Sequence, residues 1–560
     1  MPTYLEPSAV PWLSLLILAP LVGMLLVGVA AALRLDDRLV KVGAAAWSCV
    51  PLGIAAVVWA GFEPRAVAEG QAVVQFVEKV AWVQAIRVDY FVGVDGISLP
   101  LVLLTAVIAP VAMLASFGVT ERVKAHYALL FLLQAAMLGY FVALNFFFFF
   151  IFWEFSLVPA FFLVQNWGRT HPQDEDAQRR RRKAALTFFV YTMAGSVGML
   201  LLFQLFYVAT ARAGVPTFDL ITLGRLGQGL GAEGASQSLQ TILFNYVDEI
   251  GLTGVLGPFP LLYTSIAFWA IFIGFAIKLA IWPFHTWLPD AYAEAPTAGS
   301  ILLAAVMSKM GGYGMLRILL PLLPEAAQYF GPAIGALALV GVVAGAFGAL
   351  AHVRGDLKRL IGYTSINHMG YVGLAVAAAA TAGAAGAESR AIAVNGALFQ
   401  MVAHGLSTGA LFLLAGVLAA RTGTYEIGAL GGLRRTMPAL AGAMGVAGFA
   451  NLGLPGLAGF VGEFFIMRGA WATLPLFTLL ATIGLVVTAL ALLRMYGQIF
   501  HGPLRGERPQ GSHAGPPLQA AWPLLGLLVV LGLYPAPVMD LSNWAATELA
   551  STFARLLTGA

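Results

Sequence analysis

The dominant pattern along this chain is a series of long apolar runs separated by short polar loops. The runs stay apolar over about 20 residues and do not alternate with polar positions, so they predict helices that cross a bilayer rather than strands of a membrane barrel. They cover residues 11–33, 42–62, 98–118, 126–143, 145–166, 185–211, 261–284, 296–320, 331–352, 357–378, 392–420, 437–469, 473–499 and 519–538. The predicted fold class is therefore an all-α polytopic membrane protein with about 14 transmembrane helices.

Two of these runs are broken by proline. Pro283 interrupts the seventh run, and Pro455 interrupts the twelfth within Gly-Leu-Pro-Gly. Proline removes a helical hydrogen bond and leaves a carbonyl without its partner. Because the breaks recur five spans apart, we expect two inverted five-helix repeats, spans 4–8 and 9–13, each with one broken helix. Matched breaks of this kind indicate an ion pathway.

The pattern divides the chain into four predicted regions. The region 1–125 holds spans 1–3 and an extramembrane hairpin at 63–97, where apolar and polar positions alternate. The region 126–325 forms the first repeat, with a Gly-rich loop insert at 212–260. The second repeat covers 326–500, and 501–560 holds span 14 and a tail.

Composition and charge placement support this assignment. Hydrophobic residues make up 60% of the 560 residues, and charged residues only 10%, against roughly 25% in soluble domains. Of the 31 Lys and Arg residues, 20 fall in loops on the side that holds 167–184, nine fall on the opposite side, and two lie inside spans. The positive-inside rule then predicts a cytoplasmic loop 167–184 and both termini outside the cytoplasm. Topology thus accounts for the net charge of +4, and we expect a lipid bilayer and no nucleic acid as partner.

Several classes of site are excluded by residue type. The single cysteine, Cys49, rules out an internal disulfide and a Cys-ligated zinc or iron–sulfur site. The eight histidines form no HExxH motif, and no phosphate-binding GxxxxGK loop is present. The GxSxG match at 405–409 lies inside a span rather than at a strand-to-helix turn, so it does not indicate a hydrolase. We expect no metal, cofactor or redox centre in this chain.

Ionisable residues inside spans are the candidate chemistry, because a charge at the bilayer centre costs about 2.5–3.5 kcal/mol on insertion scales. A chain of such groups can pass protons, and its energy must come from an ion gradient or a partner. The rival interpretations are a structural ion pair at Glu154, a snorkelling Lys278, hydrogen-bonded core histidines and a Glu463–Arg468 salt bridge. The candidates are Glu154, Lys278, Lys309, His368, His404 and Glu463, with His285 beside Pro283 as a secondary residue.

At these positions the sequence resembles the antiporter-like membrane subunits of respiratory complex I, and within them the chain-four type (subunit M). Glu463 stands where two sister subunits usually carry lysine. Tyr292, in place of a usual histidine, Asn367, in place of a common serine, and the enlarged 212–260 loop depart from the family. The matching segments are FWEFSLVP (152–159), PFHTWLPDAYAEAPTAGSILLAAVMSKMGGYGMLR (283–317), GYTSINHMGYV (362–372), QMVAHGLSTGALFLL (400–414) and LGLPGLAGFVGEF (452–464).

The resemblance implies roles and surroundings. It implies that Glu154 pairs with Lys278, that Lys309 is a central relay, and that His368, His404 and Glu463 complete a proton path. It also implies a place in the bacterial inner membrane among other subunits of a proton-translocating NADH–quinone oxidoreductase, with NADH, FMN, iron–sulfur clusters and quinone bound by those partners. The alternatives are a subunit of a multi-component cation/proton antiporter, of a membrane hydrogenase or carbon-uptake complex, or a stand-alone transporter.

Overall fold

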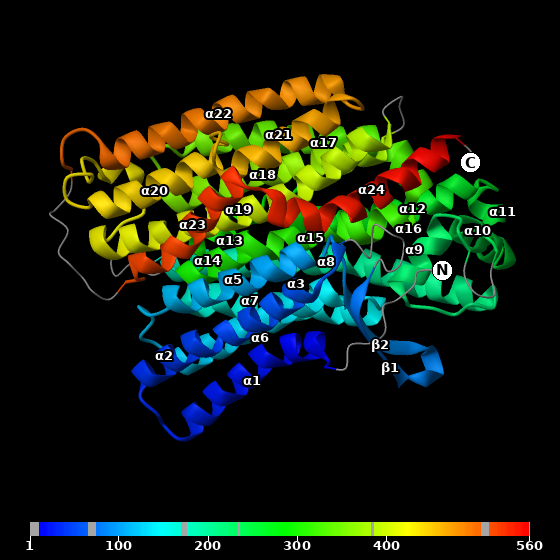
Figure 1. The fold of residues 1–560 in the computed structure, drawn as a ribbon, viewed down its shortest axis with the longest axis horizontal. Coiled ribbons are helices and arrows are strands. Elements are labelled where there is room, and N and C mark those ends of the chain that lie inside the picture. Colours follow the sequence, from blue (N-terminus) through cyan, green and yellow to red (C-terminus); the bar gives the residue numbers. More distant parts are fainter. Residues whose placement is uncertain are drawn as a thin grey trace.

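The computed structural model describes residues 10–64, 74–169, 176–231, 236–381, 386–505 and 515–558. Its helices run side by side along the long axis of the molecule, and a small β-hairpin projects from one end (Figure 1). We call this the hairpin end. The opposite end, where α2 begins and where the chain passes from α17 to α18 and from α19 to α20, carries Arg38, Arg354 and Arg359 among others, and we call it the basic end.

The first half of the chain builds one side of the bundle together with the hairpin. Its elements are α1 (Trp12–Ala32), α2 (Asp37–Trp47), α3 (Cys49–Gly61), β1 (Gln75–Val83), β2 (Val88–Val94), α5 (Leu99–Ala115), α6 (Val123–Val142), α7 (Phe146–Trp167), α8 (Ala177–Arg212), α9 (Leu220–Gly227), α10 (Leu239–Glu249), α11 (Thr253–Leu256) and α12 (Pro260–Leu279).

The second half supplies the other side and the centre. Its helices are α13 (Leu288–Glu294), α14 (Thr297–Leu302), α15 (Ser308–Gly314), α16 (Leu320–Leu322), α17 (Pro324–Ala351), α18 (Leu357–Ala380), α19 (Ala387–Thr422), α20 (Pro438–Asn451), α21 (Ala458–Trp471), α22 (Pro475–Phe500), α23 (Trp522–Leu533) and α24 (Ala536–Thr558). Two π-helical turns, Leu303–Met307 and Met315–Leu319, join α14, α15 and α16 into one helix. In α19 the most apolar stretch is buried on every side, so this helix forms the core.

A helix or a broken helix lies over each of the fourteen predicted runs. Among the described residues, ten helices are long and apolar enough to cross a membrane, and the bent pair Leu518–Leu533 and Ala536–Phe553 gives an eleventh candidate. The remaining predicted runs contain α5, α18 and the broken pair α20–α21, which are shorter or more polar. The polytopic helical fold is confirmed, while the count of fourteen, the inverted repeats and the four region boundaries stay predictions.

The predicted hairpin is present in the described part of 63–97. β1 pairs antiparallel with β2, with Lys79 opposite Phe91 and Val80 opposite Tyr90. The side chain of Glu78 accepts backbone N–H groups at the start of α1, including that of Leu13 at 2.7 Å, so the hairpin is joined to the bundle. Residues 65–73 of this predicted segment lie outside the described residues.

Both predicted helix breaks occur. α12 ends at Leu279 because Ala280 takes a left-handed conformation (φ 62°), and an irregular turn that includes Pro283 leads to α13. In the twelfth run, α20 stops at Asn451 and α21 starts at Ala458, so Pro455 lies within the intervening turn. The helix ends at the two breaks carry the buried residues Lys278 and Asn451, while Pro283 and Pro455 in the turns are exposed.

The end of the chain differs from the predicted tail. Residues after 538 continue as part of α24, which bends by 64° from α23 and runs to the hairpin end (Figure 1). α24 packs against α19 and α5. Ser542 in α24 donates a hydrogen bond to Asn395 of α19 at 2.7 Å, so polar as well as apolar contacts hold this helix in place.

Candidate functional site

The first cluster of buried ionisable groups joins α7 to α12. The Lys278 ammonium donates a hydrogen bond to the Ser156 hydroxyl at 3.1 Å and lies 4.6 Å from the centre of the Trp153 ring. Both partners come from the helix of Glu154, because residues 153 and 156 share one face of α7. Lys278 sits in the last turn of α12, where the break after Leu279 leaves helix carbonyls free of intrahelical partners.

Glu154 belongs to this cluster but makes no direct ion pair with Lys278 in the described structure. Its charge and that of Lys278 act on each other, and Ser196 of α8 lies beside the carboxylate. One oxygen, Oε1, is buried without a hydrogen-bond partner among the described residues. Glu154 and Lys278, both in the described part of the chain, are therefore neighbouring charges without a direct ion pair, and the lysine donates its hydrogen bond to the Ser156 hydroxyl instead. In this arrangement Lys278 can change its partner from Ser156 to Glu154.

A second cluster starts at Lys309 in α15. Its fully buried ammonium lies 2.6 Å from Nδ1 of His404 in α19 and donates to the carbonyl of Ala304 at 2.5 Å and to the Ser308 hydroxyl at 3.3 Å. Ala304 lies in the π-helical turn Leu303–Met307, which changes the direction of its carbonyl relative to an ideal helix. A buried ammonium needs acceptors at each of its protons, and this site supplies three.

The two histidines continue the cluster across α19 and α18. The rings of His404 and His368 lie with their centres 5.2 Å apart. His368 Nε2 is 3.2 Å from the Asn451 side-chain oxygen, and its Nδ1 is 3.2 Å from the Gln400 side-chain nitrogen. An oxygen facing Nε2 requires the proton on that nitrogen, which makes Nδ1 the site that can take up a second proton.

Glu463 ends the cluster at the second helix break. Its Oε1 lies 3.2 Å from His368 Nδ1, within ion-pairing distance. No hydrogen bond joins these two atoms among the described residues, where Glu463 Oε1 is buried without a hydrogen-bond partner, so the contact is one of proximity. Gly453 makes room for the carboxylate, because a Cβ at this position would overlap Glu463 Oε2. The carboxylate also lines a groove of about 450 Å³ between α21 and α22.

The remaining residues singled out from the sequence are not members of the two clusters. His285 lies in the turn after α12, its Nδ1 has no partner among the described residues, and no described contact joins it to either cluster. Arg468 is exposed, and the rival Glu463–Arg468 salt bridge is absent from the described residues, where Glu463 pairs with His368. Pro283 and Pro455 act as helix breakers beside Lys278 and Glu463.

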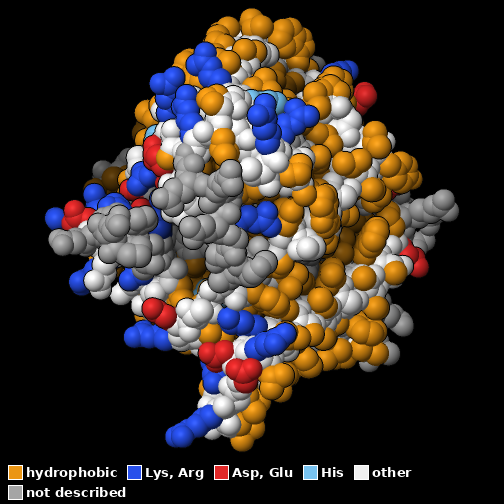
Figure 2. Space-filling model, turned by 90° about the vertical axis from the view of Figure 1, so that its left-hand side faces the viewer, with side chains coloured by type: hydrophobic (Ala, Val, Ile, Leu, Met, Phe, Trp, Pro, Cys, Tyr) orange, Lys and Arg blue, Asp and Glu red, His pale blue; other side chains and the backbone are white. Residues whose placement is uncertain are grey.

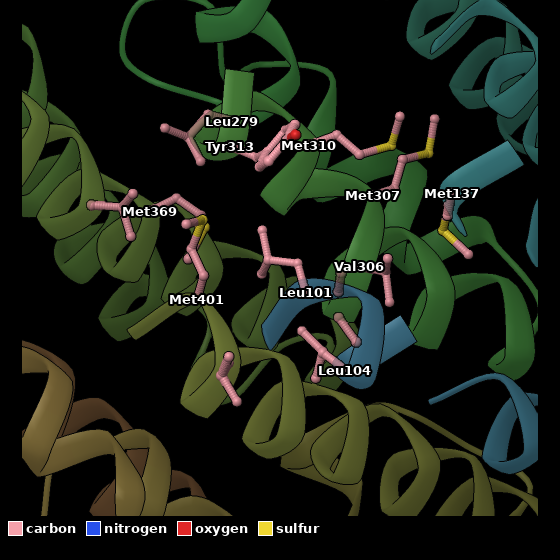
Figure 3. Close-up of a cluster of buried hydrophobic side chains, with 14 of the residues drawn as sticks. Leu101, Leu104, Met137, Leu279, Val306, Met307, Met310, Tyr313, Met369 and Met401 are labelled. Atoms are coloured by element: carbon pink, nitrogen blue, oxygen red, sulfur yellow. The ribbon is translucent and has the colours of Figure 1, made fainter. Parts of the chain in front are cut away.

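The two clusters are separated by apolar packing between α12 and α15. A Cβ at Gly311 would meet backbone atoms of Phe275 and Leu279, so these helices approach closely without polar side chains between them at that point. Around this contact lies a group of buried apolar side chains that includes five methionines (Figure 3). Methionine is flexible and fills irregular space, so this packing can adapt to movement of the helices. The labelled methionines are Met137, Met307, Met310, Met369 and Met401.

Sequence reasoning missed the neutral polar residues that orient these clusters. Ser156, Gln400 and Asn451 each contact an ionisable candidate directly. Spacing could have found one of them, because Gln400 lies four residues before His404 on one helix face, whereas Ser156, two residues after Glu154, does not share the face of that glutamate. Asn451 carried no such signal, since it meets His368 only through the fold.

Two family models and many relatives match this chain. The family model described as NADH:quinone oxidoreductase/Mrp antiporter, TM, matches residues 143–490, and that described as NADH-ubiquinone oxidoreductase chain 4, amino terminus, matches residues 72–145. The chain is 38% identical to F(420)H(2) dehydrogenase subunit M of Methanosarcina mazei, over 95% of this chain and 96% of that protein. It is 36% identical to NADH-quinone oxidoreductase subunit M of Rhodobacter capsulatus, over 92% and 91%.

Solved structures share the fold. Respiratory complex I from Thermus thermophilus with bound NADH contains a chain that superposes with a TM-score of 0.76 at 26% identity, covering 97% of this chain and 99% of that one. A chain of the Mrp complex from Dietzia superposes with a TM-score of 0.72 at 21% identity, over 97% and 99%, which shows the fold alone.

Proposed function

Because this chain belongs to the NADH:quinone oxidoreductase/Mrp antiporter family, we propose that it is the proton-translocating subunit M of an NADH–quinone oxidoreductase. It acts beside other membrane subunits in a multi-subunit complex, and the bilayer is its solvent. The observation that carries the proposal is the row of neighbouring buried groups from Lys309, 2.6 Å from His404, through the two imidazole rings, 5.2 Å apart, to Glu463, 3.2 Å from His368. Titratable groups that lie close together inside an apolar bundle are suited to moving protons.

In this proposal the second cluster is the relay. Lys309 gives a proton to His404 Nδ1, against which its ammonium already lies. The doubly protonated ring then releases a proton from Nε2 towards His368, directly or through water. His368 passes a proton to Glu463 across the Nδ1–Oε1 contact, while Gln400 and Asn451 hold the His368 ring in place.

The first cluster controls the relay in this proposal. Glu154 and Lys278 attract each other only while both are charged, so a proton taken up by Glu154 frees Lys278 from that attraction. Glu154 lies on α7 beside Phe155, which is half exposed at the surface of the chain. Glu463 lines a groove at the other side of the bundle. A neighbouring subunit that covers either surface can therefore change the charge balance of one cluster.

The chain's part in the enzyme is to move protons while partner subunits carry the electrons. We assign NADH, FMN, the iron–sulfur clusters and quinone to those partners. We place the protein in the bacterial inner membrane with its basic end towards the cytoplasm. Figure 2, which views the end opposite the hairpin, shows Lys and Arg side chains spread over that end and hydrophobic side chains over much of the adjoining surface. The positive-inside rule supports this orientation.

A substitution at the centre of the relay tests the proposal. In the assembled complex in inverted membrane vesicles, Lys309→Met is expected to lower proton translocation and coupled quinone reduction at least tenfold, because methionine keeps the volume and removes the exchangeable proton. The control is Lys124→Met, which removes a surface lysine that pairs with Asp37 at 3.5 Å and should leave both rates unchanged. Normal translocation in an assembled Lys309→Met complex would overturn the proposal.

A further inference from the structure

A cavity that the relay does not use opens at the hairpin end. It has a volume of about 540 Å³ and lies between α9 and α24, with part of the π-helical turn Met315–Leu319 beside it. Its walls carry polar groups such as Gln228, Glu548 and Ser551, so water can occupy it. Asp95 and Arg317 also line the cavity.

These two charged residues form an ion pair where the cavity meets the bundle. Arg317 Nε donates to Asp95 Oδ2 at 3.0 Å, and the Asp95 side chain is 4% exposed. The other oxygen of Asp95 accepts the backbone N–H groups of Ile97 at 3.0 Å and Ser98 at 2.8 Å, just before α5. The carboxylate is therefore fixed in place, and only the guanidinium on the opposite helix can move away from it.

The helix of Arg317 leads from this cavity to the relay. Arg317, Tyr313 and Lys309 are spaced by four residues and follow one face of the helix. The Tyr313 hydroxyl donates to the carbonyl of Phe141 at 3.2 Å and interacts with Arg317. The Tyr313 side chain is buried and does not line the cavity, whereas Arg317 does.

The backbone departs from α-helical geometry close to Lys309 and at Arg317. One π-helical turn precedes Lys309, and the second contains Arg317. Such turns occur frequently at functional sites, and they allow a helix to shift register locally at small cost. Arg317 can then rotate away from Asp95 without unwinding the whole helix.

We propose that this cavity is a second, water-filled outlet through which Lys309 exchanges protons with the hairpin side, and that the Asp95–Arg317 pair is its gate. The inference rests on the proposed function. A proton leaves the Lys309 ammonium, the Tyr313 hydroxyl takes it up and gives its own proton on, and the Asp95 carboxylate receives that proton and releases it to water in the cavity. Tyr313 ends unchanged, and no electron moves.

The gate is closed in this structure. Arg317 holds Asp95, and a fixed guanidinium repels protons from the inner end of the cavity. The Lys309 ammonium bonds to Ala304 and His404 and is engaged with the relay. Opening requires two movements, the swing of the lysine stem towards Tyr313 and the rotation of Arg317. This outlet is separate from Glu463, which lies beyond the two histidines.

A purely structural role for the pair, in which it ties α5 to the helix of Lys309, predicts that filling the cavity changes nothing. The test is therefore a covalent block. In a Cys49→Ala background, Ser551→Cys places a thiol on the cavity wall, and a positively charged methanethiosulfonate reagent fills the cavity after assembly. Val255→Cys is the matched control, because Val255 is 79% exposed at the hairpin end and does not line the cavity.

Protons translocated per electron are measured before and after labelling. Glu154→Gln serves as the reference for lost proton translocation. Labelling of Ser551→Cys should lower the number of protons per electron by at least half of the decrease seen in Glu154→Gln. Labelled Val255→Cys and unlabelled Ser551→Cys should keep the original number of protons per electron. If a fully labelled Ser551→Cys complex translocates protons normally while Glu154→Gln is inactive, the proposed outlet is wrong and the proposed function stands. Normal translocation in assembled Glu154→Gln as well overturns the proposed function.

A second variant tests the proton acceptor itself. Asp95→Asn keeps an oxygen for the N–H groups of Ile97 and Ser98 but cannot take up a proton at the gate. We expect fewer protons per electron in the assembled complex, whereas Glu249→Gln, which alters the surface pair with Arg212, leaves the ratio unchanged. An unchanged ratio in Asp95→Asn contradicts the gate. If Asp95→Asn does not assemble, the labelled Ser551→Cys complex decides the question.

Discussion

Gly453 combines two requirements in one residue. Its φ of 76° lies in the left-handed region, and a side chain here would occupy the space of the Glu463 carboxylate. Three residues further along the same turn, Gly456 has a φ of 91°, but a Cβ on it would meet nothing within 4 Å. The two glycines therefore carry similar backbone strain on substitution, about 1 kcal/mol each, and differ in their contact with the relay.

This difference gives a prediction for the end of the relay. Gly453→Ala should displace the Glu463 carboxylate from His368 and lower proton translocation several-fold, whereas Gly456→Ala should keep most of it. Proton uptake by vesicles, normalised to the amount of assembled complex, provides the measurement. Equal rates in the two variants would mean that the position of Glu463 is not set by the turn.

The sequence indicated the ionisable residues of the candidate site but not the neutral residues that contact them. Glu154, Lys278, Lys309 and Glu463 stand out because charge in lipid is expensive. Neutral polar residues such as Asn451 are cheap to bury once they are hydrogen-bonded, so they carry no comparable signal. The neighbour of Glu463 along the chain, Arg468, looked like a partner, but a residue brought in by the fold, His368, takes that place.

At the scale of elements, the contact between α17 and α18 depends on a close backbone approach. A Cβ at Gly345 would lie 2.5 Å from the backbone nitrogen of Asn367, next to His368, whereas a Cβ at Gly341 meets Trp282 at 3.6 Å, an ordinary contact. A residue without a side chain is therefore required for this close helix packing at Gly345 but not at Gly341.

Substitution by alanine should have an effect at Gly345 and none at Gly341. Gly345→Ala should push α18 away and cost about 1–3 kcal/mol as an overpacked contact, lowering both the thermal stability of the purified complex and its proton translocation. Gly341→Ala, one helical turn earlier, should leave both unchanged. Thermal unfolding followed by tryptophan fluorescence measures the first effect. A Gly345→Ala complex as stable as its Gly341→Ala counterpart would show that the helices can part without cost.

Element boundaries were predictable where hydropathy alone decides them. The proline breaks follow directly from the sequence, and the short gap at Ala143–Asn145 between α6 and α7 follows from the length that one membrane span allows. The length of α24 did not, because only one face of this helix is apolar and the rest is polar, so its hydropathy falls below that of a spanning run. Its position is set by contacts with α19, such as Ser542 with Asn395, that no local pattern reveals.

For the molecule as a whole, the placement of its two ends gives a topological prediction. The start of α1 bonds to β1, and Thr552 near the end of α24 contacts Gln228, so both lie at the hairpin end. In a Cys49→Ala background, Val255→Cys should react with a membrane-impermeant thiol reagent only from outside the cytoplasm. Thr436→Cys, exposed at the basic end, should react only from the cytoplasm. Labelling of both from one side would contradict a single orientation of the bundle.

The apolar contact between α12 and α15 has an electrical consequence. A voltage of 100 mV across the membrane is worth about 2.3 kcal/mol for each charge that crosses it. An uninterrupted line of exchangeable protons between the two faces would let this voltage discharge through the protein. Phe275 and Leu279, packed against Gly311, belong to the apolar layer that keeps the two charged clusters apart at rest, and Leu279 lies near Met310 (Figure 3). A few closely packed apolar side chains thus prevent protons from leaking through the bundle down the membrane potential.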